Sequence, residues 1–430
     1  MARGKTSSEV VGTDLGRLQR LLDRPELERV VDALRDRLER GGGERVSIAD
    51  PTEPERRAAD ELLGRRPSSG RRLIVPLAQL EAILQRAGVA SGLEAAITAL
   101  RGPLRDRPAE REQTLAAWRA LFERHRPEAE RLGACAWLDG LEKDGLLKRV
   151  AGRDPVRAET LLGQALGVLK RLPAQGSALS TLAADCLGDA HGLDAGRPVA
   201  SLLRRALTLS ALALSAPTPG AGPPDASDDE LWAGVGVLIG GGITSTALVL
   251  NLTADGDTVP ATCLRAAAAV GEPIYLTLRH LVRQPVLWCV GPGPISVCEN
   301  PAVVAEAANR LGNGCRPLIC TRGQPSAAVT TLLGQLVRAG ATIRYHGDFD
   351  WAGIRIANGV IARHGALPWR MAAADYRNAE PSGKALSEDA ADAIWDPNLA
   401  PAMRARGQAI EEERLLGVLL GDLISLLLQH

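Results

Sequence analysis

The sequence lacks the cysteine spacing of a zinc site or a disulfide scaffold, because none of its seven cysteines belongs to a CxxC pair. Odd, dispersed cysteines are typical of proteins in a reducing cytoplasm. The first residues contain no apolar core of a secretion signal. The apolar run 415–428 is too short to cross a bilayer and contains Asp422. We therefore expect a cytoplasmic protein that is not attached to a membrane.

The sequence also lacks net charge, since 51 lysines and arginines are balanced by 51 aspartates and glutamates. A surface that binds nucleic acid would have to be a local patch. Affinity for nucleic acid grows with the number of phosphates neutralised, so such a patch would bind only modestly unless a partner delivered the nucleic acid. The arginine-rich stretch 101–131 is interleaved with acids, which favours a solvated helix face over a DNA contact.

The length of 430 residues allows two or three domains. Residues 1–215 form a mainly helical region, which could bind DNA or a partner and in which residues 72–87 could belong to a winged helix. The proline- and glycine-rich residues 216–230 predict a linker. We interpret residues 231–290 as a mixed α/β connecting segment. Their GGGITST stretch lacks the lysine of a phosphate-binding loop and predicts a turn.

The sequence pattern changes in residues 291–430, where short apolar runs alternate with segments of helical periodicity. The runs PISVCE, RPLICT, ATIRYHG and ALPWRM read as strands. Strands that alternate with helices over short connections predict an α/β domain with a parallel sheet and flanking helices, followed here by a C-terminal helix. In such sheets ligands bind at the carboxyl ends of the strands.

Three carboxylates fall at those ends. Glu299 is the last residue of the first predicted strand, and Asp348 and Asp350 end the third, where we expect an exposed position. Residues i and i+2 of an extended segment point the same way, so both aspartates could face one cation. Oxygen ligands without histidine or thiolate suit Mg²⁺ or Mn²⁺. Gly347 would leave room beside the acids and Gly353 would allow close backbone approach. The alternative is that Asp350 simply caps the next helix.

A strand ending in glutamate, followed by helix, strand, helix and a strand ending in DxD, resembles the Toprim domain of topoisomerases, primases and related nucleases. VCENPAVVAEAA and YHGDFDWAGIRIA resemble more closely the nuclease subunit, JetD, of the Wadjet anti-plasmid systems, which is related to the type IIB topoisomerase A subunit. The closer resemblance runs from about Ile274 to near the C-terminus. The N-terminal half is similar to the helical region of one Wadjet-type lineage.

The resemblance implies roles for individual residues. Glu299 would bind metal or assist proton transfer, and Asp348 and Asp350 would bind the metal. The glutamate run 411–413 matches a glutamate-rich helix of the nuclease branch, and Glu412 is the candidate for a further ligand. Such a run is more often the solvated face of a helix.

Type IIB topoisomerases cleave DNA with a tyrosine on a helical domain before Toprim, whereas residues 1–274 contain no tyrosine. Tyr275 is close in sequence to Glu299, and hydrolysis by activated water is the remaining route. We therefore expect a magnesium-dependent endonuclease that cuts double-stranded, circular plasmid DNA beside SMC-like subunits, as a homodimer. The alternatives are a non-catalytic DNA-binding or scaffold subunit with a Toprim fold, and a DxD phosphohydrolase of small molecules. The latter usually has aspartate, not glutamate, after the first strand.

Overall fold

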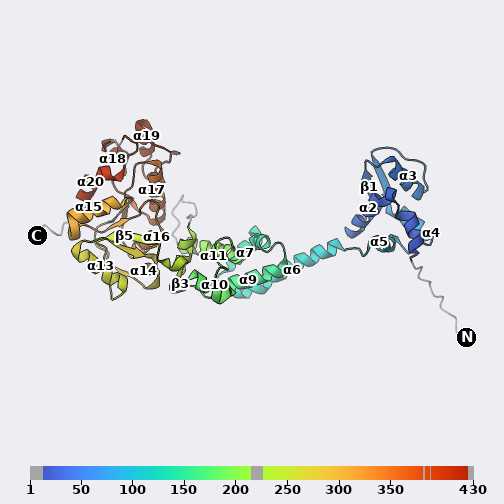
Figure 1. Cartoon of the computed structure of the whole chain (residues 1–430), viewed down its shortest axis with the longest axis horizontal. Coiled ribbons are helices and arrows are strands. Elements are labelled where there is room, and N and C mark those ends of the chain that lie inside the picture. The colour runs from blue at the N-terminus through green and yellow to red at the C-terminus, as the bar shows by residue number, and fades with distance from the viewer. Residues whose placement is uncertain (1–12, 215–225, 381–382, 388, 425–430) are drawn as a thin grey trace. The chain divides into compact units, whose positions relative to one another are not determined.

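The computed structural model describes residues 13–214, 226–380, 383–387 and 389–424 (Figure 1). The chain divides into two compact units, Met1–Leu121 and Phe122–His430. The sequence placed the division at residues 216–230 instead. Of these, residues 216–225 lie outside the described residues, and Ser227 caps helix α12 (Asp228–Gly234) with a capping box. No helix within the described ranges is long and apolar enough to cross a bilayer.

The first unit is a set of helices packed against a two-stranded antiparallel ribbon of β1 (Arg45–Ala49) and β2 (Arg72–Pro76). Burial alternates along both strands, so Val46, Ile48, Leu73 and Val75 face the helices. The predicted strand and helix over 72–87 are confirmed by β2 and α4. The helices of this unit are α1 (Leu15–Leu22), α2 (Glu28–Glu39), α3 (Glu53–Leu62), α4 (Leu77–Arg86) and α5 (Leu93–Arg101).

Helix α6 (Arg107–Arg131) crosses the division and opens a helical segment of the second unit. The predicted helical character of this part of the chain is confirmed. Asp154 caps α9 and Pro155 occupies its first turn, where a missing N–H costs nothing. The helices of the segment are α7 (Cys135–Asp144), α8 (Leu146–Val150), α9 (Pro155–Leu169), α10 (Leu179–Leu187) and α11 (Pro198–Leu214).

The rest of the second unit is built on a six-stranded sheet. Its strands, in spatial order, are β12 (Leu367–Pro368), β11 (Ile343–Tyr345), β9 (Ile295–Cys298), β10 (Leu318–Cys320), β5 (Thr246–Leu250) and β7 (Ile274–Thr277). The first four run parallel, as predicted, whereas β5 is antiparallel to both its neighbours. The segment 231–290, predicted as a mixed α/β connecting segment, supplies two strands of this sheet, which therefore begins before residue 291.

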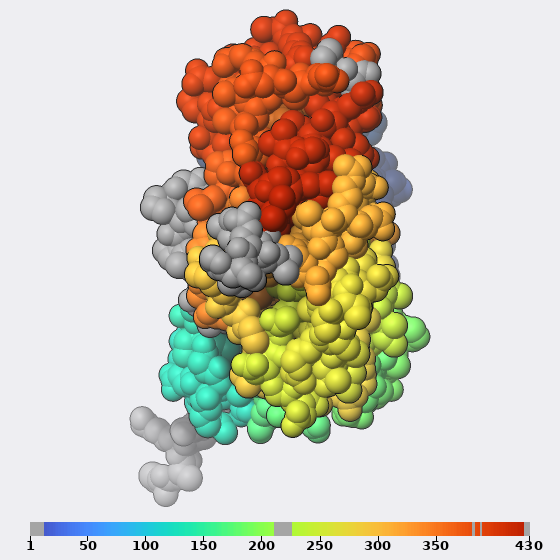
Figure 2. Space-filling view, turned by 90° about the vertical axis from the view of Figure 1, so that its left-hand side faces the viewer, coloured from blue at the N-terminus to red at the C-terminus, as the bar shows by residue number. Residues whose placement is uncertain are grey.

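Every residue of β9 and β10 is buried, as expected for parallel strands that are covered on both faces. The C-terminal helix α20 packs on α15, and Figure 2 shows the red C-terminal segment lying against the orange part of the surface. The helices around the sheet are α13 (Val259–Val270), α14 (Leu278–Arg283), α15 (Pro301–Leu311), α16 (Ala327–Arg338), α17 (Trp351–His364), α18 (Ala373–Asn378), α19 (Leu399–Arg406) and α20 (Leu416–Leu423).

Candidate functional site

The structure brings the three predicted acids to one edge of the sheet. Strands β9 and β11 are parallel neighbours in which Val297 pairs with Tyr345. Glu299 directly follows β9, and Asp348 and Asp350 follow β11. The expected adjacency of the two strands is confirmed, although 49 residues separate Glu299 from Asp348 in the sequence.

Backbone N–H groups hold one oxygen of each carboxylate. The N–H of Asp348 donates to Glu299 Oε2 at 3.2 Å. The N–H of Glu412 donates to Asp348 Oδ1 at 2.7 Å, and that of Gly353 donates to Asp350 Oδ1 at 2.7 Å. Within the described residues, no backbone N–H holds the second oxygen of these three carboxylates. The acids are therefore oriented while retaining an oxygen for a ligand.

The capping interpretation of Asp350 is confirmed, because it is the N-cap residue of α17. Capping does not exclude metal binding, since an ionised carboxylate accepts at about four lone-pair sites. The predicted roles of the two glycines are also confirmed. A Cβ on Gly347 would lie 2.6 Å from Glu299 Oε2, and a Cβ on Gly353 would overlap the carbonyl of Asp348. Any side chain at either position would push the acids apart.

Glu299, Asp348 and Asp350 are half-buried, so the expectation that the two aspartates lie at an exposed strand end is wrong. Burial, followed by the charge of Asp348, raises the pKa of Glu299 to about 7. Burial likewise raises the pKa of Asp348 to about 6, with the charge of Asp350 adding to it. The cause is structural: α17 and the segment before α20 close over the end of the sheet. The cluster therefore gathers negative charge in a partly buried place.

Glu412 is the most buried of the acids, with no exposed surface. Its carboxylate accepts the N–H of Glu299 at 3.1 Å and that of Asn300 at 2.6 Å. Burial raises the pKa of Glu412 well above its ordinary value. The interpretation of the run 411–413 as a solvated face is therefore wrong for Glu412. Its carboxylate is engaged by the backbone behind Glu299, which favours a positioning role over direct ligation.

The other two glutamates of the run lie further out. Glu413 is exposed and accepts a hydrogen bond from the Asn300 side chain. Glu411 forms an ion pair of 3.6 Å with Lys384. Neither carboxylate has the burial that distinguishes Glu412.

One cation at this edge was missed by the sequence reasoning. Arg322 follows β10, is exposed, and has a left-handed backbone with φ of 57°. Its guanidinium lies 5.7 Å from the centre of the half-exposed Tyr275 ring. The next residue, Gly323, donates its N–H to the carbonyl of Glu299 at 3.4 Å. No ion pair of Arg322 occurs in the part of the chain that the structure describes, and its guanidinium lies over Tyr275 of β7, on the side of β10 away from β9.

The acids do not form a closed metal site by themselves. Across the described residues, no three His, Cys, Asp or Glu side chains are gathered tightly enough to hold an ion as they stand. The oxygens of Glu299, Asp348 and Asp350 that carry no backbone hydrogen bond are the chemical type that Mg²⁺ and Mn²⁺ prefer. A cation here would draw those oxygens inward and complete its shell with water and substrate.

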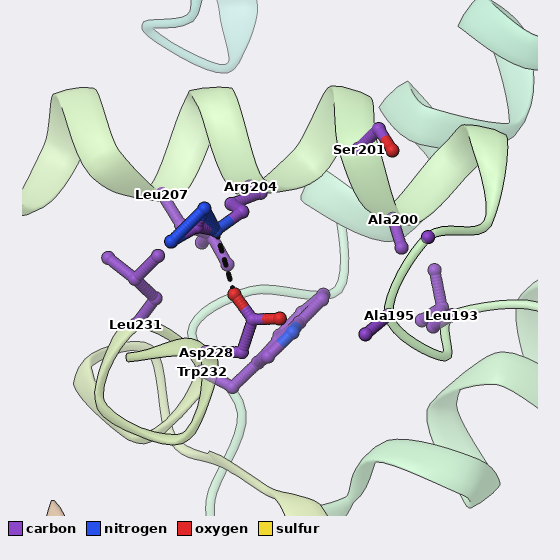
Figure 3. Close-up of a pocket in the computed structure, with 10 residues that line it drawn as sticks. Leu193, Ala195, Ala200, Ser201, Arg204, Leu207, Asp228, Leu231 and Trp232 are labelled. Atoms are coloured by element: carbon purple, nitrogen blue, oxygen red, sulfur yellow. Dashed lines mark hydrogen bonds and ion pairs between the residues drawn. The ribbon is translucent and has the colours of Figure 1, made fainter. Parts of the chain in front are cut away.

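A separate hollow lies between α11, α12 and the loop around residues 193–196 (Figure 3). Arg204 and Asp228 form an ion pair of 2.8 Å across it, beside the ring of Trp232. This contact fastens α12 to α11. None of the lining residues belongs to the acid cluster, so the hollow is not part of the candidate site.

Two family matches cover most of the chain. Residues 274–423 match the family described as "Protein of unknown function C-terminus (DUF2399)". This match begins at Ile274, the first residue of β7, and contains all the acids of the site. Residues 43–254 match the family described as "Protein of unknown function N-terminus (DUF3323)". No curated protein matches the chain. Neither family description names an activity.

Proposed function

We propose that the protein is a metal-dependent DNA endonuclease of the Toprim type, which hydrolyses phosphodiester bonds. The observation that carries the proposal is the meeting of Glu299, Asp348 and Asp350 at the carboxyl ends of two neighbouring parallel strands. Each has one oxygen fixed by the backbone and another left for a ligand. This edge is where parallel sheets bind their ligands.

The chemistry of the donors fits Mg²⁺ or Mn²⁺. The raised pKa values of Glu299 and Asp348 arise from burial and crowded negative charge, which a divalent cation would relieve. When bound, such a cation would neutralise phosphate oxygens and favour ionisation of the attacking water. Asp348 and Asp350 would hold it. Glu299 would add a ligand or accept the proton of the water, the two roles that the Toprim resemblance implies.

Arg322 would attract the DNA to this edge. A phosphodiester approaching a cluster of carboxylates is repelled until cations offset the charge. The guanidinium of Arg322 can bind two phosphate oxygens at once. Its neighbour Gly323 is hydrogen-bonded to the backbone of Glu299, so the base of the arginine lies near the acids, and its side chain would turn from Tyr275 toward the phosphate.

The positions of the tyrosines favour hydrolysis over a covalent protein–DNA intermediate. Tyr345 and Tyr376 are fully buried, and the hydroxyl of Tyr376 donates to the carbonyl of Gln408. Tyr275 is 50% exposed but belongs to β7 of the same sheet. The type IIB enzymes, by contrast, place their tyrosine on a separate helical domain. Tyr275→Phe should therefore cleave normally, and denatured reactions should contain no protein attached to DNA.

The resemblance to the Wadjet nuclease subunit extends this proposal to the biological setting. The substrate would be circular double-stranded plasmid DNA in the cytoplasm, delivered by SMC-like subunits. A homodimer would supply one acid cluster for each DNA strand.

A cleavage assay on supercoiled circular DNA tests the proposed function. We expect nicked and linear products with Mg²⁺ or Mn²⁺, and none when a chelator is present or in the Asp348→Asn variant. DNA binding without cleavage under all metal conditions would instead favour a scaffold subunit. Turnover of a small phosphate ester with no cutting of DNA would favour a DxD phosphohydrolase. Either outcome would refute the endonuclease.

A further inference from the structure

The first unit carries an arginine-rich loop between α3 and β2. Between Glu61 and Glu81 the sequence contains no acidic residue. The basic residues of this stretch are Arg65, Arg66, Arg71 and Arg72. Proline and glycine within the loop exclude regular structure. An acid-free stretch of this kind stands out in a chain whose total charge is zero.

Two buried charged side chains of α3 hold this loop in place. Asp60, only 3% exposed, accepts the N–H of Ser68 at 2.6 Å and the Nε–H of Arg65 at 2.7 Å. Arg56, 7% exposed, donates to the carbonyl of Gly70 and to the Ser68 hydroxyl. Burying charged groups is unfavourable unless hydrogen bonds satisfy them, and here the loop supplies those bonds. The loop is therefore pre-organised although it is exposed.

The ribbon next to the loop has a flat, exposed outer face. Ser47 and Ala49 of β1 point outward, opposite Ile74 and Arg72 of β2. Arg45 lies at the end of the same face. Small side chains along a two-stranded ribbon permit close approach by a large partner, while arginines at its ends supply charge.

These arginines differ from most others in the unit, which are paired with acids. Arg29 binds Glu55 and Arg101 binds Asp23, at 3.0 and 2.8 Å. By contrast, Arg45, Arg66 and Arg72 have no ion pair in residues 13–121. Arg71 has a 3.4 Å contact with Asp50, but its side chain is 92% exposed, where such a pair contributes little.

We infer that duplex DNA binds to the outer face of the β1–β2 ribbon and to the loop 64–72. We call these two parts together the arginine ribbon. Arg66, Arg71 and Arg72 would neutralise backbone phosphates, and the ribbon would lie along the major groove, which is wide enough for two antiparallel strands. Four exposed arginines, Arg45, Arg66, Arg71 and Arg72, outnumber the two exposed acids that flank β1, Glu44 and Asp50. This excess selects a polyanion, and the ribbon geometry selects a duplex. This contact lies outside the acid cluster and requires no cleavage.

The test is DNA binding by the full chain in chelator, with a fluorescent duplex of about 30 base pairs, across a series of salt concentrations. The variant Arg66→Gln/Arg71→Gln/Arg72→Gln removes the proposed contacts. The variant Arg17→Gln/Arg20→Gln/Arg86→Gln is the matched control, because these arginines are exposed on α1 and α4. Both substitute three surface charges, so the two variants have the same net charge.

Each phosphate contact contributes about 0.9 to the slope of log affinity against log salt. Loss of three contacts should reduce the magnitude of this slope by about 2.7. The factor by which affinity falls between 50 and 200 mM salt should then be about 40 times smaller in the variant than in wild type. The control should keep the wild-type slope. Equal slopes in the test variant and wild type, or no duplex binding by the folded wild-type chain at 50 mM salt, would overturn the inference.

The two proposals fail separately. A chain that binds DNA through the arginine ribbon but never cuts it would refute the endonuclease alone. A chain that cuts DNA, and whose test variant binds with wild-type affinity and slope, would refute the arginine ribbon alone. Preference for an acidic protein or for duplex RNA over DNA would also refute the assigned partner.

Discussion

Glu412 and Asp348 are joined across 64 residues of sequence, because the N–H of Glu412 donates to Asp348 Oδ1 at 2.7 Å. The carboxylate of the same glutamate accepts the N–H of Glu299. One residue of the C-terminal segment therefore fixes both strand ends that carry the acids. The segment 411–415 is part of the architecture of the site and not an appendage to it.

Glu412→Ala should lower both stability and cleavage. It leaves the N–H groups of Glu299 and Asn300 without their acceptor, which costs about 1–3 kcal/mol for a buried group. Glu412→Gln keeps the size and one acceptor oxygen and should recover much of the loss. Denaturant unfolding and cleavage rates measure the two effects, with the exposed Glu413→Ala as control. Equal effects of the two alanine substitutions would contradict the positioning role.

Asp350 permits a separation of its capping and ligand roles. Asparagine caps helices as well as aspartate does, whereas alanine costs about 1 kcal/mol. Asp350→Asn should therefore unfold at nearly the wild-type denaturant concentration and yet fail to cut DNA. Asp350→Ala should lose both stability and cleavage. Wild-type cleavage by the asparagine variant would show that Asp350 is a cap and nothing more.

Replacing Arg322 with glycine should affect stability and DNA binding in opposite directions. Its left-handed backbone suits glycine, so Arg322→Gly should leave stability unchanged or raise it by up to about 1 kcal/mol. The same change removes the proposed phosphate contact and should raise KM for DNA more than it lowers kcat. Arg322→Lys is the control, because it retains the positive charge. Arg310→Gly would not serve, because Arg310 lies within α15 and glycine would destabilise that helix. An unchanged KM in the glycine variant would remove Arg322 from the site.

Glu299 and Asp348 should make the metal-free protein less stable as pH rises from about 4 to 7. His346 and His364, whose pKa values are lowered to about 4 by burial, contribute in the opposite direction. The pKa of Glu299 is raised to about 7 and that of Asp348 to about 6, so at these two groups the folded state binds more protons than the unfolded chain in this range. Their contribution to stability then falls with increasing pH until both groups are ionised. Urea unfolding in chelator measures the pH dependence, and comparing wild type with Glu299→Gln isolates the contribution of Glu299: wild type should lose stability relative to this variant as pH rises. Added Mn²⁺ should restore stability at pH 7 and above. If the stability difference between wild type and Glu299→Gln stays constant or moves the other way with pH, the crowding of the acids is contradicted.

The strand-end rule predicted where Glu299, Asp348 and Asp350 lie, because the alternation of strands and helices is visible in the sequence. The strand-end rule does not reach Glu412, which only the family resemblance singled out, as a candidate ligand; three consecutive glutamates resemble a solvated face, and only the fold shows that Glu412 turns inward. Buried Arg56 and Asp60 were missed for the same reason. Strands β5 and β7 were not predicted individually, because β5 is buried almost throughout and β7 has only four residues, so neither shows the alternation that marks a half-buried strand.

Calorimetric titration of the full chain with Mn²⁺ tests the central claim most directly. If Glu299, Asp348 and Asp350 form the metal site, wild type should bind Mn²⁺ at neutral pH. Asp348→Asn should then weaken this binding at least tenfold, whereas Glu413→Gln should leave it unchanged. Absence of binding to the folded wild-type chain, or equal binding by the Asp348→Asn variant, would contradict the account.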